Sequence, residues 1–181
     1  LQTLGFKSLC KNVCISDKAS HYNTKNISIG NNVRIDEFFI LSDGVGGISI
    51  GNYIHVACYC YLIGLEKIEI KDFSGLSSRV AIYSSNDDYS GEYLISPCVP
   101  PEYTNVTHGP VILEKHTLVG AGSVLLPNVT VGYGTAIGAL SLIAKSCDEK
   151  SIYVGNPAKR IKSRKTGFEK MESLLLQNEQ L

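Results

Sequence analysis

Two adjacent carboxylates, Asp87 and Asp88, stand in the polar stretch SSNDDYSG, residues 84–91, where the periodic sequence on both sides is interrupted. Close acids can transfer protons, because the charge of one carboxylate raises the pKa of the other. Aspartate and serine clusters also form ordinary turns, since their side chains bond the neighbouring backbone. The stretch is therefore interpreted either as part of a reaction site or as a turn.

Two histidines offer similar chemistry. His108 stands just before the periodic pattern resumes. His55 lies in the periodic part of the sequence before the interruption, near Tyr59. Histidine titrates near neutral pH, so either residue could act in catalysis or bind an acceptor. His21 and His116 are interpreted as ordinary surface histidines.

Aliphatic residues recur every six positions from Leu113 to Ile143, a period that fits neither an amphipathic helix nor an alternating strand. It is typical of a solenoid whose coils are triangles of three short strands, with one aliphatic side chain per side pointing inward. Three earlier coils fit the same spacing. The fifteen expected inward residues are Ile29, Ile35, Leu41, Ile50, Val56, Leu62, Ile70, Leu76, Ile82, Leu113, Val119, Leu125, Val131, Ile137 and Ile143. The predicted fold is therefore an all-β, parallel β-helix.

The corners of this solenoid also have a sequence pattern. Steps of nine residues after Leu41 and of eight after Leu62 predict small insertions that bulge outward. Small or β-branched residues, which suit a tight corner, stand two places before the later inward residues. They are Thr117, Ser123, Val129, Thr135 and Ser141.

The period fails over one long segment and at both ends. Thirty-one positions separate Ile82 from Leu113, so a loop over about residues 86–110 is expected to leave the solenoid. The expected organisation is a β-helix domain over residues 1–164, whose first 25 residues cap one end, and a C-terminal helix over residues 165–181. That helix spaces apolar residues along one face, expected to cover the open end of the solenoid or a neighbouring molecule. They are Phe168, Met171, Leu174 and Leu175.

The segments GPVILEKHTLVGAGSVLLPNVTVGYGTAIGALSLIAKS and SIYVGNPAKRIK carry the repeat most clearly. With the earlier coils, from Ile29 to Arg164, they resemble the hexapeptide-repeat acyltransferases and are similar to sugar O-acetyltransferases of the galactoside and maltose type. The resemblance implies a left-handed parallel β-helix, whereas general sheet chirality favours right-handed crossovers. It also implies a homotrimer, an acetyl-CoA donor and a sugar acceptor held near the long loop.

The resemblance assigns catalysis to a histidine at the start of the loop, and counting the repeat forward puts its position on Asp87. An aspartate can replace it as a base only if burial or the charge of Asp88 raises its pKa. The role could instead belong to His108 or His55, or an amino-sugar acceptor that is already partly deprotonated needs no base. The expected substrate-binding residues are Asn86, Tyr89 and Tyr59.

The same resemblance locates the donor. Small residues line the groove in which the family holds the pantetheine arm, and a terminal loop closes it. The corresponding positions are Ala121, Ala139 and Lys145, with Gly155 and Pro157 in the terminal loop. The following basic residues could meet the nucleotide phosphates, although a plain surface role is equally open. They are Lys159, Arg160 and Lys162.

Composition excludes several classes of function. Seventeen basic and seventeen acidic residues cancel in a chain of 181 residues, so no charge field favours nucleic acid or an anionic membrane. No apolar stretch is long enough to span a membrane, and a cytoplasmic protein is expected. The six cysteines form no Cys-x-x-Cys pair and are interpreted as ordinary thiols.

We therefore expect an acetyl-CoA-dependent acetyltransferase that modifies a hydroxyl or amine of a sugar or nucleotide sugar, such as one destined for a surface polysaccharide. Oxygen acetylation is favoured over nitrogen acetylation. One alternative is a non-catalytic β-helix used as a structural or binding module, although the long loop argues against a plain scaffold. The other is a metal-dependent enzyme of the carbonic anhydrase type. It needs closely spaced ligands, but no two histidines stand closer than His108 and His116, and no metal is expected.

Overall fold

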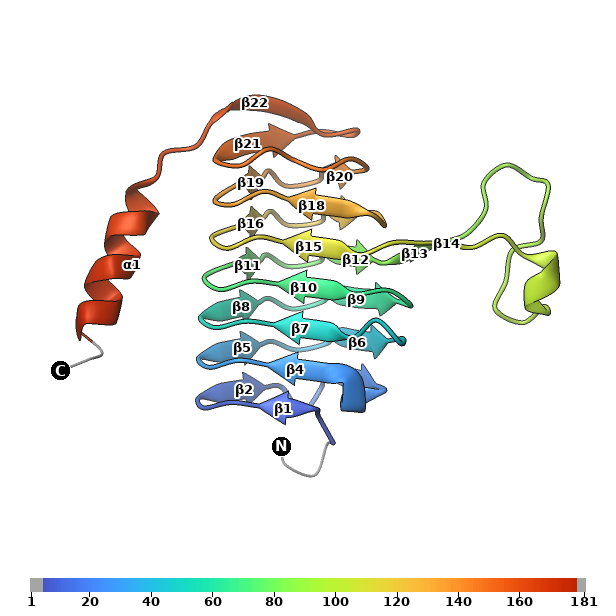
Figure 1. Cartoon of the computed structure of the whole chain (residues 1–181), viewed down its shortest axis with the longest axis horizontal. Coiled ribbons are helices and arrows are strands. Elements are labelled where there is room, and N and C mark those ends of the chain that lie inside the picture. The colour runs from blue at the N-terminus through green and yellow to red at the C-terminus, as the bar shows by residue number, and fades with distance from the viewer. Residues whose placement is uncertain (1–4, 179–181) are drawn as a thin grey trace.

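Short strands stack into parallel sheets that form the three sides of a solenoid (Figure 1). The computed structural model describes residues 5–178. Sheet A contains β1 (Ser8–Leu9), β4 (Ile27–Ile29), β7 (Ile48–Ile50), β10 (Ile68–Ile70), β15 (Val111–Leu113) and β18 (Val129–Val131). Sheet B contains β2 (Val13–Ile15), β5 (Val33–Ile35), β8 (Ile54–Val56), β11 (Gly75–Leu76), β16 (Leu118–Val119), β19 (Ala136–Ile137), β21 (Ser151–Val154) and β22 (Lys159–Ser163). Sheet C contains β3 (Ser20–Tyr22), β6 (Ile40–Asp43), β9 (Tyr61–Gly64), β12 (Ala81–Tyr83), β17 (Val124–Leu125) and β20 (Leu142–Ile143).

The solenoid is a left-handed parallel β-helix, as the resemblance implies. As the chain climbs in Figure 1, the strands of sheet A in front run to the left and those of sheet B behind them run to the right. Each coil visits sheets A, B and C in turn, so the molecule has A–B, B–C and C–A corners. These corners bring residues of successive coils into columns on the outside of the solenoid.

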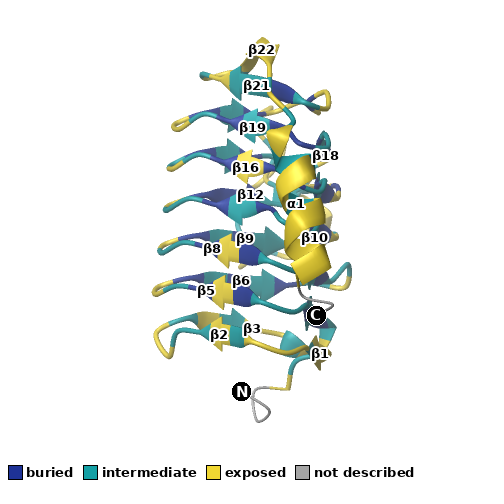
Figure 2. Cartoon of the chain, turned by 90° about the vertical axis from the view of Figure 1, so that its left-hand side faces the viewer, coloured by how far each residue is buried: buried dark blue, intermediate teal, exposed yellow. Residues whose placement is uncertain are grey.

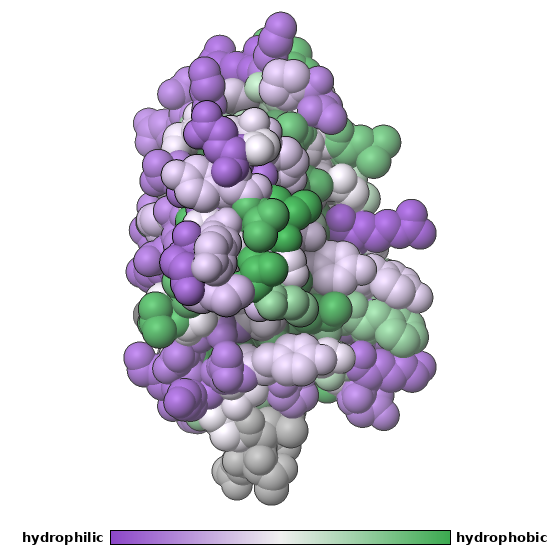
Figure 3. All heavy atoms as spheres, turned by 90° about the vertical axis from the view of Figure 1, so that its right-hand side faces the viewer, coloured by the Kyte–Doolittle hydropathy of each residue, from purple (hydrophilic) through white to green (hydrophobic). Residues whose placement is uncertain are grey.

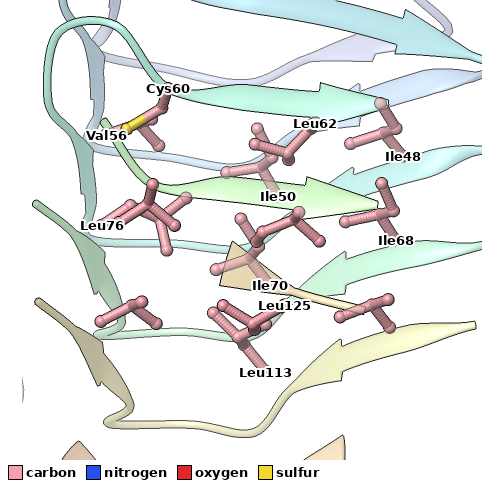
Figure 4. Packing of buried hydrophobic residues seen from close by; sticks show 14 of the residues in the cluster. Ile48, Ile50, Val56, Cys60, Leu62, Ile68, Ile70, Leu76, Leu113 and Leu125 are labelled. Atoms are coloured by element: carbon pink, nitrogen blue, oxygen red, sulfur yellow. The ribbon is translucent and has the colours of Figure 1, made fainter. Parts of the chain in front are cut away.

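All fifteen predicted inward residues are buried, none with more than 2% of its surface exposed. Residues of successive coils pair in register, as Ile50 with Ile70 and Ile70 with Leu113, and their side chains stack inside the triangle (Figure 4). Each such side chain contributes roughly 1.5 to 3 kcal/mol by leaving water. The predicted corner residues are buried too, because the strand alternation turns them inward.

The N-terminal segment forms a further coil where we expected an aperiodic cap. Leu9, Ile15 and His21 pair with the inward residues of the next coil and keep the six-residue spacing. The spacing was hidden because a histidine holds the third inward position. His21 lies near Phe6, with ring centroids 5.6 Å apart, so it is not an ordinary surface histidine. Residues 1–4 of the expected cap lie outside the described residues.

The helix α1 (Gly167–Asn178) does not cover the open end of the solenoid, the first of the two places expected for it. It runs along the side of the stack and is largely exposed (Figure 2). Phe168 packs on His116, with centroids 4.6 Å apart, whereas Met171 and Leu174 of the predicted stripe are 57% and 45% exposed. At the end of the solenoid, strand β22 instead pairs antiparallel with β21.

Two corners present columns of residues in the left-handed backbone conformation. The A–B column consists of Asn12, Asn32, Tyr53, Phe73, His116, Gly134 and Lys150. The B–C column consists of Phe38, Tyr59, Arg79, Gly122 and Leu140. Backbone bonds between coils stack the members, because from Asn32 upward in the A–B column and from Tyr59 upward in the B–C column each N–H reaches a carbonyl of the coil before it, as Tyr53 N to Asn31 O at 2.9 Å and Tyr59 N to Glu37 O at 3.1 Å.

Candidate active site

The long loop leaves the solenoid at the C–A corner, and its two arms pair as antiparallel strands. These are β13 (Ser85–Asn86) and β14 (Thr107–His108), with a 3₁₀ turn (Pro101–Tyr103) farther out. Outside the loop, a second 3₁₀ turn (Thr24–Asn26) lies near the base of the solenoid, between β3 and β4. The buried Ser84 starts the loop by donating its hydroxyl to the Glu66 carbonyl at 2.7 Å. Gly64 lies directly below, where a side chain would collide with Ser84. The loop root is thus fixed while its tip projects (Figure 1).

Asp87 and His108 lie on opposite arms of the loop and line one hollow of about 600 Å³. Within residues 5–178, the Asp87 carboxylate forms no hydrogen bond or ion pair, and Asp87 is exposed. The His108 Nδ1 atom lies 2.8 Å from the Ser85 hydroxyl, which orients the ring at the loop root. The loop therefore brings together two of the predicted catalytic residues and leaves the carboxylate of Asp87 available.

Asp88 has a different environment. Its carboxylate accepts hydrogen bonds from the Ser90 hydroxyl at 2.6 Å, from the Ser90 N–H at 3.0 Å and from the Gly91 N–H at 3.3 Å. The Ser90 hydroxyl above all, together with Asn105, holds the pKa of Asp88 below its ordinary value. Of the two open interpretations of the pair, this arrangement favours a turn for Asp88.

The predicted substrate-binding residues of the loop are less engaged. The Asn86 backbone carbonyl accepts a bond from the Thr107 hydroxyl at 3.2 Å, which ties the two arms together. Tyr89 is 86% exposed and does not line the hollow. Leu94 and Ile95 are 57% and 63% exposed on the same loop. Figure 3 shows an apolar area at the centre of the face from which the loop projects.

His55 lies on the outer face of sheet B, away from the loop. Its Nε2 atom is 2.8 Å from the Asp36 carboxylate, whose other oxygen accepts a bond from Arg34 at 2.7 Å. Burial opposes ionisation, but the bonds from Arg34 and His55 hold the pKa of Asp36 below its ordinary value. His55 also lines a shallow hollow of about 300 Å³ that reaches Ser77 and Ser78 at the B–C corner.

Tyr59, the third predicted substrate-binding residue, stands in the B–C column. Its ring stacks on Phe38 with centroids 4.9 Å apart and an interplanar angle of 17°. Phe38, Ser77 and Arg79 carry no sequence signal of their own, although the six-residue spacing places all three at this corner. Only the knowledge that the corner is open to solvent distinguishes them from other corner residues.

Several of the predicted donor-binding residues gather at the upper coils. Lys145, Pro157, Lys159 and Arg160 line a hollow of about 420 Å³ beside β20. The Arg160 guanidinium donates to the hydroxyls of Ser151 and Ser163, each at 2.9 Å, so it is partly engaged already.

The other predicted donor-binding residues lie outside that hollow. Ala121 and Ala139 stand on neighbouring coils at the B–C corner, where the Leu140 N–H donates to the Ala121 carbonyl at 2.8 Å. Gly155 is held by a bond from its N–H to the Ser141 hydroxyl at 3.1 Å. Lys162 lies in β22 and does not line the hollow.

The remaining candidates have structural environments. His116 is not the surface histidine expected from the sequence, since only 6% of it is exposed and its Nε2 atom lies 2.8 Å from Glu172 of α1. Within residues 5–178, all six cysteines are free, and burial raises the pKa of the Cys60 and Cys147 thiols to about 11. In the same range, no three His, Cys, Asp or Glu side chains are placed to hold a metal ion. Nor does that range contain a helix long and apolar enough to cross a membrane.

Comparisons with known proteins bear on whether the acceptor atom is oxygen or nitrogen. No protein-family model matches the sequence. The dTDP-4-amino-4,6-dideoxy-D-glucose acyltransferase of Escherichia coli is 51% identical over 174 residues, which cover 96% of this chain and 91% of that protein. AntD, an N-acyltransferase from Bacillus cereus solved with dTDP and 3-hydroxybutyryl-CoA, is 47% identical with a TM-score of 0.96. That match covers 99% of this chain and 95% of AntD.

A maltose O-acetyltransferase from Clostridium difficile 630 is more distant. It is 23% identical with a TM-score of 0.61, and the match covers 91% of this chain and 73% of that one. This likeness shows the shared fold alone. The sequence-based preference for oxygen acetylation is therefore wrong, because the relative that matches nearly the whole chain at 47% identity acylates nitrogen. The repeat alone could not reveal this, since one solenoid serves both acceptors.

Proposed function

Because the chain belongs to the hexapeptide-repeat β-helix acyltransferases, we propose that it transfers an acyl group from a coenzyme A thioester to the amine of a dTDP-linked 4-amino-4,6-dideoxy sugar. The nearly full-length likeness to the Escherichia coli acyltransferase of that sugar carries the proposal. A serine mutant of AntD has also been solved with dTDP-4-amino-4,6-dideoxyglucose and coenzyme A. The donor we propose is an acyl-CoA whose acyl group is not limited to acetyl, because AntD was solved with 3-hydroxybutyryl-CoA.

An amine acceptor is consistent with an aspartate at the position where similar O-acetyltransferases place a histidine. A sugar hydroxyl holds its proton tightly, so its attack on a thioester needs a base that titrates near neutral pH. An amine is partly deprotonated at that pH, since amino groups have pKa values from about 8 upward. The free carboxylate of Asp87 can pair with the ammonium form, hold the nitrogen in place and accept its proton.

The reaction then balances without a covalent enzyme intermediate. The ammonium loses a proton to Asp87 or to water, and the free amine attacks the carbonyl carbon of the thioester. A carbon–nitrogen bond forms and the carbon–sulfur bond breaks. The nitrogen loses a second proton as the amide forms, and the thiolate of coenzyme A takes up one proton, so the products are an amide, free coenzyme A and one released proton.

Ser77 is a second candidate for the same site. Structures of AntD exist with one aspartate or one serine replaced, and the two positions are ten residues apart. Ser77 and Asp87 have this spacing, as do Ser78 and Asp88. The first pair is favoured because the Asp88 carboxylate is already engaged in the turn at Ser90.

Ser77 and Asp87 lie at opposite ends of one side of the triangle. The strand β12 separates them, and the six or so residues of that side span about 20 Å at roughly 3.3 Å per residue. A site that uses both residues therefore combines the B–C corner of one copy with the loop of another. We propose a homotrimer for this reason.

The outer face of sheet C supports assembly. Aligned outward positions on β6, β9, β17 and β20 are apolar and only partly buried in the single chain. They are Ile40, Tyr61, Val124 and Leu142, with Ile63 on the neighbouring outward row. Such a row is more apolar than a solvated face needs to be and suits contact with a second copy.

The donor would approach from the upper coils. Its phosphates would meet Lys145 and Lys159 at the hollow beside β20, and its pantetheine arm would follow the small residues Ala121 and Ala139 down the B–C corner. This path ends near Ser77 and brings the thioester to the level at which the loop leaves the solenoid.

The proposal is tested by thiol release from acyl-CoA in the presence of dTDP-4-amino-4,6-dideoxyglucose. We expect Asp87→Asn to lower kcat/KM about a hundredfold or more, with an unchanged melting temperature because this carboxylate has no partner in residues 5–178. Asp88→Asn is the matched control and should keep most of the activity. Thiol release by the wild type that does not depend on the amino sugar would refute the proposal.

A further inference from the structure

The exposed pair Phe38 and Tyr59 is the largest aromatic surface of the B–C corner. The two rings are stacked, yet 44% of Phe38 and 43% of Tyr59 remain exposed. Both residues hold the left-handed backbone, with φ of 57° and 60°, which costs a bulky side chain roughly 1 to 2 kcal/mol. Phe73 at the A–B corner has the same φ and serves packing, so it is the exposure of Phe38 and Tyr59 that points to binding.

One side of this stack is already occupied and the other is free. The Lys18 ammonium lies 5.7 Å from the centre of the Phe38 ring, on the lower end of the column. Above Tyr59 stands Arg79, whose backbone N–H donates to the Cys58 carbonyl at 3.0 Å. Within residues 5–178, no ring or cation other than Phe38 contacts the Tyr59 ring.

Arg79 presents an unused charge beside the free face of Tyr59. It is exposed, and within the described part of the chain its guanidinium forms no ion pair or hydrogen bond. Gly122 occupies the next position of the column and has no side chain to cover it. Other basic residues near this corner are engaged, as Arg34 is with Asp36. Arg79 is therefore ready to bind an anion from solvent.

A flat ring next to a free guanidinium is the complement of a nucleotide. Bases stack on aromatic side chains, and an arginine fork binds phosphate through paired hydrogen bonds. Neighbouring coils lie about 4.8 Å apart, and the long arginine side chain adds several ångströms of reach. We propose that Tyr59, supported by Phe38, stacks on the base and that Arg79 binds the diphosphate of the nucleotide-sugar acceptor.

This subsite rests on the proposed function. It adds a position for the nucleotide to those proposed for the sugar and for the acyl donor. Ser77 and Ser78 belong to the same turn as Arg79, so a sugar attached to the diphosphate lies beside them. Ala121, which stands on the coil above, belongs to the donor path. The nucleotide therefore occupies the lower coils of the B–C corner, the donor occupies the upper coils, and the amine meets the thioester between them.

Binding of dTDP, measured by titration calorimetry on the full chain, tests the role of Tyr59. We expect Tyr59→Ala to weaken dTDP binding about tenfold or more, because stacking on one base is lost. Tyr59→Phe keeps the ring and should bind as the wild type does. Tyr22→Ala removes a tyrosine that is 58% exposed on sheet C and should leave the affinity unchanged.

The role of Arg79 is tested by comparing dTDP with thymidine. Arg79→Met should weaken dTDP binding at least tenfold and leave thymidine binding unchanged, since only the diphosphate contact is removed. Equal losses for both ligands, or wild-type dTDP affinity in Tyr59→Ala, overturn the inference. Light scattering on each variant separates ligand contact from assembly, because weakened dTDP binding that comes with a changed molecular mass would assign the loss to assembly and also overturn the inference.

The inference and the proposed function fail separately. If the wild type releases thiol only with the amino sugar and Tyr59→Ala keeps full dTDP affinity, the nucleotide subsite is refuted and the acyltransferase proposal is supported. Weakened dTDP binding in Tyr59→Ala, in a protein that acylates no amino sugar, supports the nucleotide subsite and refutes the reaction.

Discussion

The A–B and B–C corners share the left-handed backbone conformation, but their aromatic side chains have different roles. At the A–B corner, Tyr53 and Phe73 stack with centroids 4.6 Å apart, and Phe73 continues onto His116 at 5.2 Å. Phe168 at the start of the helix α1 packs on His116, and the helix runs down the side of the stack from there (Figure 2). At the B–C corner, Phe38 and Tyr59 stack in the same way, but no helix lies over them within residues 5–178.

The difference teaches how to separate stability from binding in a repetitive molecule. A stacked aromatic pair gains contact energy in either column. In the A–B column that energy also holds the helix, through Lys115 and His116 bonded to Glu172 and through Arg164 bonded to the His116 carbonyl at 2.8 Å. In the B–C column the rings face solvent, where a ligand can use them. Aromatic type alone does not distinguish the two columns.

The largest effect should come from the core that supports both columns. Val119→Asp places an unpaired charge where the wild-type side chain is fully buried and is expected to destabilise the fold by more than about 4 kcal/mol. Leu118→Asp, one residue earlier on the outward side, is the control and should cost less than about 1 kcal/mol. Urea denaturation measures both. Equal stability of the two variants would contradict the inward register.

A matched pair of substitutions compares the columns directly. Phe38 and Phe73 share a φ of 57°, so alanine removes the same ring from the same backbone conformation. We expect Phe73→Ala to cost about 2 kcal/mol or more, because it also undermines His116 and the helix. Phe38→Ala should cost about 1 kcal/mol or less but weaken dTDP binding. If both variants lose the same stability and keep full dTDP affinity, the distinction between the columns is wrong.

A smaller effect should appear in acid. Burial raises the pKa of Glu172, but bonds from Lys115 and His116 outweigh it and hold the pKa below the ordinary value of 4.5. The stabilisation from this carboxylate is therefore present above pH 4.5 and is lost as the pH falls through the lower pKa of the folded state.

Glu172→Gln should remove that acid dependence and detach α1 earlier on heating, as followed by limited proteolysis after Arg164. Glu169→Gln is a control on the same helix, since Glu169 pairs with Lys150 at 3.1 Å and is more exposed than Glu172. An unchanged pH profile in Glu172→Gln would show that the carboxylate does not hold the helix.

The sequence predicts the buried core of the solenoid far better than it predicts the contacts on the outer surface. One aliphatic residue every six positions defines the register, and the burial of all fifteen follows because each coil has room for one such side chain per face. The position of α1 was not predictable in the same way. It depends on Phe168 and Glu172 meeting His116, a contact across about fifty residues that no local period encodes.

The candidate site shows the same division. The loop, the position of Asp87 and the small residues of the donor path could be located from where the period breaks and from the resemblance. The engagement of Asp88 in its own turn, and the open aromatic stack of Phe38 and Tyr59, required the structure. The acceptor atom is a property of the substrate, so neither the repeat nor the fold could fix it.

The most direct test of the central claim compares two acceptors that differ at one atom. The protein is incubated with acyl-CoA and either dTDP-4-amino-4,6-dideoxyglucose or its 4-hydroxy counterpart, dTDP-6-deoxyglucose, and the product is identified by mass spectrometry and hydroxylamine treatment. We expect one equivalent of thiol per amide formed from the amine, stable to hydroxylamine, and a rate at least a hundredfold lower with the hydroxyl sugar. A hydroxylamine-labile ester, or equal rates with both sugars, would contradict the account.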